Sequence, residues 1–144
     1  MYAVVSVWNI LLAVDESAYS RQAVPVAVDI AKKSGGEIIV FHVREHAAYS
    51  GVPGTWEVES KEKAHGLVDG LKQEIEAAGV PARAEVRRRL AGRVAQAILD
   101  AADEHEADLV VMGSRGVSDL RGLLLGSVTH KVLQLSDRAV LVAR

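Results

Sequence analysis

The sequence predicts an α/β protein: a single domain over residues 1–144 with a doubly wound, five-stranded parallel sheet and helices on both faces. Two observations carry this prediction. Short continuous apolar runs alternate with stretches of helical spacing, and no internal repeat or interdomain linker interrupts the alternation. Strands joined by helices pair in parallel through right-handed crossovers. We expect the strand order 3-2-1-4-5.

The first part of the chain contains two expected strands separated by a helix. Residues 6–14 are rich in Val, Ile and Leu, which is typical of a strand covered on both faces. Apolar residues then recur at helical spacing until Gly35, a glycine stop. Residues 37–43 form the second expected strand. Residues 44–57 have no clear period and are expected to be a loop.

The rest of the chain continues the alternation. Helical spacing returns over residues 64–78 and stops at Gly79 and Pro81. Residues 82–90 alternate roughly and carry an arginine cluster, which predicts an edge strand with a solvated face rather than a nucleic-acid site. The remaining expected elements are a third helix opened by Gly92, a fourth strand at 109–112, a helix at 127–135 and a short fifth strand at 139–143.

Composition excludes several classes of protein. The formal net charge of −2 provides no basic field for nucleic acid or acidic membranes. The absence of cysteine excludes a disulfide framework, thiolate zinc sites and cysteine nucleophiles. The apolar N-terminal run starts without Lys or Arg and is interrupted by Ser6 and Asn9, unlike a signal peptide or membrane span. We expect a cytoplasmic protein that binds neither nucleic acid nor membrane.

A glycine constellation near the C-terminal end is the main functional signal. Gly113 and Gly116 follow an apolar strand, and Gly126-Ser127 comes after a gap of nine residues, directly before a helix. Glycine lets an anion approach the main chain closely, and the unpaired amides of a helix's first turn favour phosphate. The spacing matches neither the P-loop nor the dinucleotide fingerprint. Glycines in such a loop can also serve the turn alone.

The expected strand order brings a second feature to the same place. In open α/β sheets the ligand crevice lies at the carboxyl ends of the strands, where the strand order reverses. For the order 3-2-1-4-5 this reversal falls between the first and fourth strands. Asp15 ends the first strand and Gly113 ends the fourth. Asp15 is therefore either a ligand contact or the cap of the following helix.

Across essentially its whole length the chain resembles the universal stress protein family, in its single-domain, ATP-binding subclass. The matching segments are residues 10–17 (ILLAVDES), 40–43 (VFHV), 108–116 (DLVVMGSRG) and 125–132 (LGSVTHKV). Both the two-residue and the nine-residue gaps between glycines agree with that subclass. The resemblance implies an ATP-binding regulatory protein that acts through nucleotide-dependent conformation or dimer interaction, with Mg²⁺ on the phosphates.

The resemblance also implies roles for particular residues. Glycines 113, 116 and 126 with Ser127 would surround the triphosphate. Val43 would lie against the adenine. The full set of implied nucleotide-binding residues is Ala13, Asp15, Val43, Met112, Gly113, Arg115, Gly116, Gly126, Ser127, Val128 and Thr129. Family members commonly dimerise through the last strand, and a homodimer is expected here, although this chain has Asp137-Arg138 where the family usually carries a proline.

Several alternatives stay open at this stage. Arg115 and Arg121 would pair with phosphate or remain solvated, while Ser127 and Thr129 would bond phosphate or cap their own helix. The five histidines have no metal-binding spacing, so we expect no dedicated transition-metal site.

Alternative functions are a slow ATP hydrolase or phosphotransferase with Glu16 as base, a sensor of AMP or cyclic AMP, and a nucleotide-independent interaction protein. We expect no catalytic residues and, at most, slow ATP hydrolysis. Valine at Gly113 or Gly126 is expected to abolish nucleotide binding and leave the fold largely intact.

Overall fold

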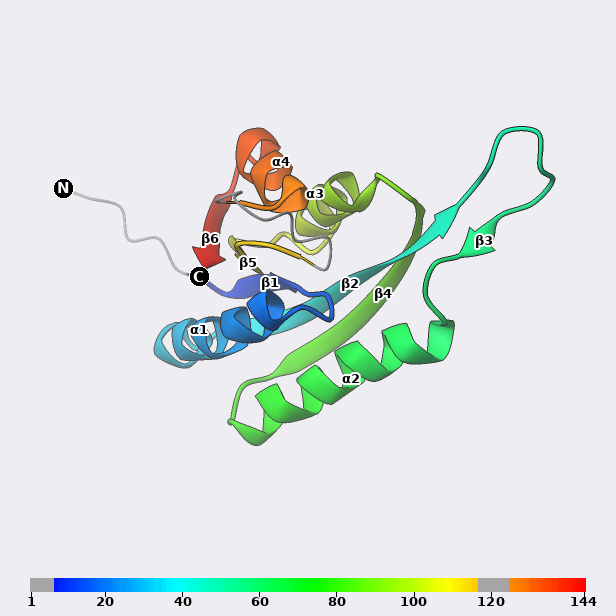
Figure 1. Cartoon of the computed structure of the whole chain (residues 1–144). Coiled ribbons are helices and arrows are strands. Elements are labelled where there is room, and N and C mark those ends of the chain that lie inside the picture. Colours follow the sequence, from blue (N-terminus) through cyan, green and yellow to red (C-terminus); the bar gives the residue numbers. More distant parts are fainter. Residues whose placement is uncertain (1–6, 117–124) are drawn as a thin grey trace.

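A computed structural model describes residues 7–116 and 125–144 and shows one sheet with helices on both faces (Figure 1). The elements in chain order are β1 (Asn9–Ala13), α1 (Ala18–Ser34), β2 (Glu37–Ala47), β3 (Trp56–Glu57), α2 (Lys61–Ala77), β4 (Ala82–Leu90), α3 (Val94–Glu104), β5 (Leu109–Gly113), α4 (Ser127–Leu135) and β6 (Ala139–Ala143).

The five longer strands pair in parallel in the order β4-β2-β1-β5-β6. In the chain order of these strands this is 3-2-1-4-5, so the prediction is confirmed for them. Ile10 of β1 lies between Ile38 of β2 and Leu109 of β5. The strand order reverses between β1 and β5, whose carboxyl ends therefore border the expected crevice.

The loop predicted for residues 44–57 is wrong in part. β2 continues to Ala47 and pairs with β3 in antiparallel fashion, which adds a sixth, two-residue strand. We call residues 44–57 the hairpin arm; it extends away from the rest of the molecule in Figure 1. Glu57 pairs with Arg44 inside the arm at 3.2 Å and holds the arm to the sheet by pairing with Arg88 of β4 at 2.8 Å. These contacts join residues that are distant in the sequence, so the arm has no local hydrophobic periodicity by which the sequence could predict it.

Alternate residues of the central strands face two separate apolar layers. Ile10 and Leu12 pack with α1 and α2, whereas Leu11 and Ala13 pack with α3 and α4. The buried faces of the helices explain the spacing seen in the sequence: Ala23, Val24, Ala27 and Ala31 of α1, Ala64, Val68, Leu71 and Ile75 of α2, and Ala97, Ile98, Ala101 and Ala102 of α3 are all buried. Within the described ranges, no helix is long and apolar enough to cross a membrane.

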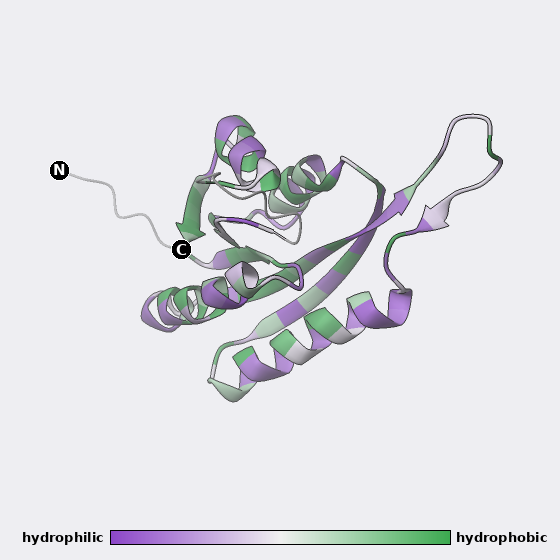
Figure 2. Cartoon of the chain, in the orientation of Figure 1, coloured by the Kyte–Doolittle hydropathy of each residue, from purple (hydrophilic) through white to green (hydrophobic). Residues whose placement is uncertain are grey.

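The edge position of β4 is confirmed, but its arginine face is less solvated than predicted. Figure 2 shows hydrophilic and hydrophobic residues alternating along this strand. The Arg87 side chain is only 12% exposed; its guanidinium pairs with Glu85 and Glu104 and lies 5.3 Å from the centre of the Phe41 ring. Burial by itself lowers the pKa of Arg87, but the hydrogen bonds to Glu104 and Glu85 outweigh it and raise that pKa above its usual value. Arg87 is thus ion-paired and largely buried, whereas Arg83 and Arg88 pair with Glu37 and Glu57 and stay exposed, as predicted for a solvated face.

Two glycines inside α2 make a direct test of helix propensity. Gly66 and Gly70 are exposed, and a Cβ added at either would meet no atom within 4 Å. Alanine removes the excess backbone entropy of glycine without a steric cost, so Gly66→Ala and Gly70→Ala should each stabilise the protein by about 0.5–1 kcal/mol. Urea denaturation measures this change. A loss of stability in both variants would contradict the helix as described.

Candidate functional site

A cavity of about 430 Å³ opens at the carboxyl ends of β1 and β5. All eleven residues assigned to the nucleotide from the sequence line it, although they come from four separate segments of the chain. They are Ala13, Asp15, Val43, Met112, Gly113, Arg115, Gly116, Gly126, Ser127, Val128 and Thr129. The structure therefore brings the predicted set together at the topological switch point. Arg121 lies outside the described residues.

Asp15 is held rigidly where β1 leads into α1. Its Oδ1 accepts hydrogen bonds from the Ser17 amide at 2.8 Å and the Ser20 hydroxyl at 3.0 Å. The Ser20 hydroxyl in turn accepts from the Asp15 amide at 2.8 Å. Ser17, not Asp15, is the N-cap of α1. The Asp15 carboxylate thus organises the turn and faces the cavity, with Oδ2 2.6 Å from where a Cβ on Gly116 would lie.

The glycines allow three segments to approach one another closely. A Cβ on Gly113 would lie 2.6 Å from the carbonyl carbon and oxygen of Tyr19, in the first turn of α1. A Cβ on Gly126 would lie 3.2 Å from the Arg115 Cα. The Gly126 amide also donates to the Ser114 carbonyl at 2.7 Å. These contacts correct the expectation that valine at Gly113 leaves the fold intact, because the obstacle there is helix backbone, which cannot turn aside.

The first turn of α4 presents backbone amides to the cavity. Gly126 is the N-cap and, as a glycine, makes no side-chain capping bond to this helix. Within 7–116 and 125–144, the first amide of the helix with a backbone partner is that of His130, which donates to the Gly126 carbonyl at 2.9 Å. The amides of Ser127, Val128 and Thr129 precede it, at the positive end of the helix dipole. Such an end favours a phosphate group.

The two hydroxyls of α4 have different environments. Thr129 is buried, and its Oγ1 donates to the Gly113 carbonyl at 2.9 Å, which ties α4 to the end of β5. Ser127 is exposed at the cavity. The sequence left both roles open for both residues. The structure gives Thr129 a positioning role and leaves the Ser127 hydroxyl at the surface.

One end of the cavity is apolar. Ala13, Val43 and Met112, all predicted from the resemblance, lie there as part of the layer that packs on α3 and α4. Sequence reasoning missed three further residues of this end, namely Phe41, Val94 and Ile98. Phe41 lies two residues before Val43 on the same strand, so strand alternation places both side chains on one face. This alternation could have predicted from the sequence that Phe41 lines the cavity together with Val43.

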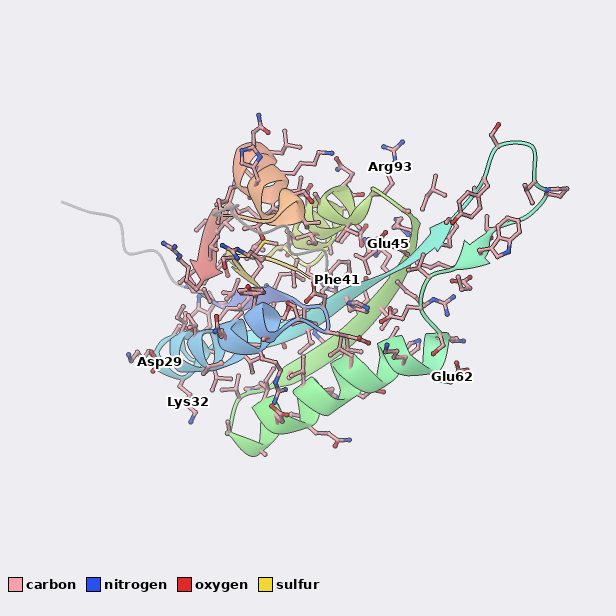
Figure 3. All side chains as sticks on the ribbon, in the orientation of Figure 1. Asp29, Lys32, Phe41, Glu45, Glu62 and Arg93 are labelled. Carbon is pink, nitrogen blue, oxygen red and sulfur yellow. The ribbon has the colours of Figure 1, made fainter. Side chains whose placement is uncertain are left out.

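Beside the glycine loop with Asp15 and the apolar end, the cavity has a third wall, formed by residues at and just before the start of α2. The sequence did not predict this wall. Val58, Glu59 and Lys63 line the cavity although they lie beyond the expected loop. The buried His42 holds this wall: its Nδ1 lies 2.7 Å from the Val14 carbonyl oxygen and its Nε2 lies 2.8 Å from Glu59 Oε1. A carbonyl can only accept, so Nδ1 carries a proton and donates. Figure 3 shows Glu62 at this end of α2 and Glu45 further along β2 from Phe41.

The charges around the cavity are mixed. Among the described residues, its lining includes the carboxylates of Asp15, Glu16, Glu45 and Glu59 and the cations Lys63 and Arg115. Arg115 lies against Tyr19, with its guanidinium 5.6 Å from the ring centre and Nη1 3.4 Å from the hydroxyl. No group of three or more His, Asp or Glu side chains that could hold a metal ion occurs in 7–116 or 125–144.

Comparisons with known proteins show the family of this chain. The family model described as the universal stress protein family matches residues 8–144. Universal stress protein YxiE of Bacillus subtilis is 33% identical over 148 residues, with 94% of this chain and 98% of the relative covered. A universal stress protein of Thermus aquaticus is 36% identical over 137 residues, with 94% and 98% covered.

Solved structures agree with the sequence relatives. The universal stress protein UspA of Lactobacillus plantarum has a TM-score of 0.79 at 22% identity and covers 98% of this chain and 100% of its own. A universal stress protein solved in complex with cAMP has a TM-score of 0.68 at 26% identity, with 97% and 98% covered. The fold, the family match over nearly the whole chain and the relatives above 30% identity lead to one conclusion: this chain belongs to the universal stress protein family.

Proposed function

We propose that the protein binds an adenine nucleotide in this cavity, with ATP as the leading candidate, and acts as a regulatory protein whose conformation or dimer interaction depends on occupancy. One observation carries the proposal: the first turn of α4 with its glycine N-cap, the glycine loop and an apolar end line a single cavity. Backbone amides suit phosphate, and apolar side chains suit a purine ring.

The solved relatives support the nucleotide class. The protein at 26% identity was solved with cAMP. Universal stress proteins of Archaeoglobus fulgidus with dAMP and of Arabidopsis thaliana with AMP share the fold at 20% and 16% identity, with TM-scores of 0.70 and 0.65. All three ligands are adenine nucleotides with one phosphate. The number of phosphates on this protein's own ligand therefore has to be measured.

From the cavity lining we infer which residues would contact each part of the ligand. Phosphate oxygens accept from the amides around Gly116 and from the first turn of α4. The adenine lies against Val43 and Met112. Asp15 is an acceptor when ionised and repels phosphate, so its carboxylate takes a ribose hydroxyl instead. The ligand then runs from the apolar end past Asp15 to the glycine loop.

The lining also fits a magnesium ion carried in with the phosphates. Mg²⁺ keeps several waters and is commonly bound through one or two carboxylates and substrate phosphates. Asp15 and Glu16 are neighbouring carboxylates at the cavity, and no cluster of three ligating side chains occurs in the described ranges. A magnesium ion would neutralise phosphate charge beside these carboxylates.

The homodimer remains part of this proposal. Within the described residues β6 pairs only with β5, so its other edge is open to a second copy. Arg138, in the segment where the family usually carries a proline, donates to the Ala107 carbonyl at 2.9 Å, which ties the start of β6 to its own subunit. Sedimentation of the protein with and without nucleotide tests both the dimer and its dependence on occupancy.

The proposed function is tested by identifying what the protein holds. Denaturing freshly purified protein should release adenine nucleotide, identified by chromatography and mass spectrometry. For nucleotide-free protein, a ligand at about 100 times its Kd should stabilise by about 2.7 kcal/mol and raise Tm by several degrees. Release of nothing, together with an unchanged Tm in ATP, ADP, AMP and cAMP, would overturn the proposal. Following ADP appearance in the same samples measures hydrolysis.

A further inference from the structure

We propose that Lys63, in the first turn of α2, is the cation that reads the phosphate chain and makes the site prefer nucleotides with more phosphates. This inference rests on the proposed function, because it assumes an adenine nucleotide in the cavity. Lys63 lines the cavity and lies in the wall that the sequence did not predict. Figure 3 marks this end of α2 by Glu62.

The turn that carries Lys63 is anchored to the site from both sides. Ser60 is the N-cap of α2, and its hydroxyl accepts from the Lys63 amide at 3.1 Å. The preceding residue, Glu59, bonds to His42, whose other ring nitrogen donates to Val14. Because the side chain of His42 is 7% exposed and that of Glu59 is 16% exposed, water screens this pair little. The backbone of Lys63 is thereby fixed, while its side chain extends into solvent-exposed surroundings.

The present partner of Lys63 is one that a phosphate can replace. Lys63 Nζ lies 3.0 Å from Glu16 Oε1, and the two side chains are 61% and 40% exposed. Exposed pairs of this kind contribute at most about 1 kcal/mol. Glu16 directly follows Asp15, whose carboxylate borders Gly116. Lys63 is therefore connected through two adjacent residues to the glycine loop where the phosphates are proposed to lie.

Charge balance gives Lys63 its expected effect. The described lining contains four carboxylates and two cations, and of these cations Arg115 is held against Tyr19. Each added phosphate brings further negative charge into this setting. An ammonium on a flexible stem is a point charge well suited to phosphate oxygens. Its contribution should grow from AMP to ADP to ATP.

Isothermal titration of ATP, ADP and AMP into four proteins tests the inference: wild type, Lys63→Met, Glu16→Gln and the double variant. Lys63→Met should weaken ATP binding about tenfold, the loss of one charged hydrogen bond, and change AMP binding less than about twofold. In Mg²⁺-free buffer, where Glu16 has no metal ion to hold, Glu16→Gln should tighten ATP binding by freeing Lys63, and that gain should shrink in the double variant. Lys61→Met is the matched control, since this exposed lysine lies two residues away and outside the cavity lining.

Two results would count against different claims. If wild type binds nucleotide and Lys63→Met weakens ATP and AMP equally, or no more than Lys61→Met does, the phosphate-reading role is wrong while nucleotide binding stands. If wild type binds none of the three nucleotides, the proposed function itself fails. Melting curves of each variant check the fold; because Lys63 is exposed, its replacement should leave Tm close to that of wild type.

Discussion

Replacing Gly113 by valine is expected to destabilise the protein by about 3 kcal/mol or more, a large part of the stability of an ordinary domain. A Cβ at this position would lie 2.6 Å from the carbonyl carbon and oxygen of Tyr19 and 3.0 Å from the Ser20 amide nitrogen. All three atoms are backbone of the first turn of α1. Relief therefore requires that the helix move away from β5, which would open the layer between them.

Urea denaturation of Gly113→Ala and Gly113→Val measures this effect. Alanine already introduces the clashing atom, so both variants should lose stability, valine more than alanine. Gly70→Val is the matched control, because a Cβ at Gly70 meets no atom within 4 Å. Valine and glycine differ by only a few tenths of a kcal/mol in helix propensity, so this variant should have nearly the stability of wild type. A Gly113→Val protein within 1 kcal/mol of wild type would show that α1 does not lie this close to β5.

Replacing Gly116 by valine is expected to weaken nucleotide binding by about a hundredfold or more while costing about 1 kcal/mol of stability. The added Cβ would lie 2.6 Å from Asp15 Oδ2. This carboxylate is fixed through its other oxygen by Ser17 and Ser20, so it must turn out of its place beside the ligand. The valine side chain also enters the space proposed for phosphate.

Titration of ATP into Gly116→Val, with denaturation of the same sample, separates binding from folding. Gly113→Val cannot make this separation, because its main effect is on the packing of α1. Gly66→Ala serves as a control glycine replacement that leaves the cavity untouched. An ATP affinity within twofold of wild type in a folded Gly116→Val protein would remove the glycine loop from the phosphate site.

Particular residues show why the sequence predicts so much of this site. Asp15 and Gly116 are about a hundred residues apart, yet both follow strands that local apolar runs identify. Parallel pairing brings the ends of β1 and β5 to one edge of the sheet, so identifying the two strands was enough to bring the two loops together. The glycine spacing before α4 is likewise a local signal, because it marks where a helix begins.

The sequence by itself determined the order of the five parallel strands, the switch point between β1 and β5, and the residues of the glycine loop, of the first turn of α4 and of part of the apolar end of the cavity. Only the tertiary structure decided the third wall, the hairpin arm and the burial of Arg87. Glu57 meets Arg44 and Arg88, Glu59 meets His42, and Lys63 meets Glu16 through contacts between distant segments. Periodicity records which face of an element is buried. Periodicity does not record which charged side chains form ion pairs when separate elements pack. The pairs Glu59–His42 and Lys63–Glu16 hold the start of α2 at the site.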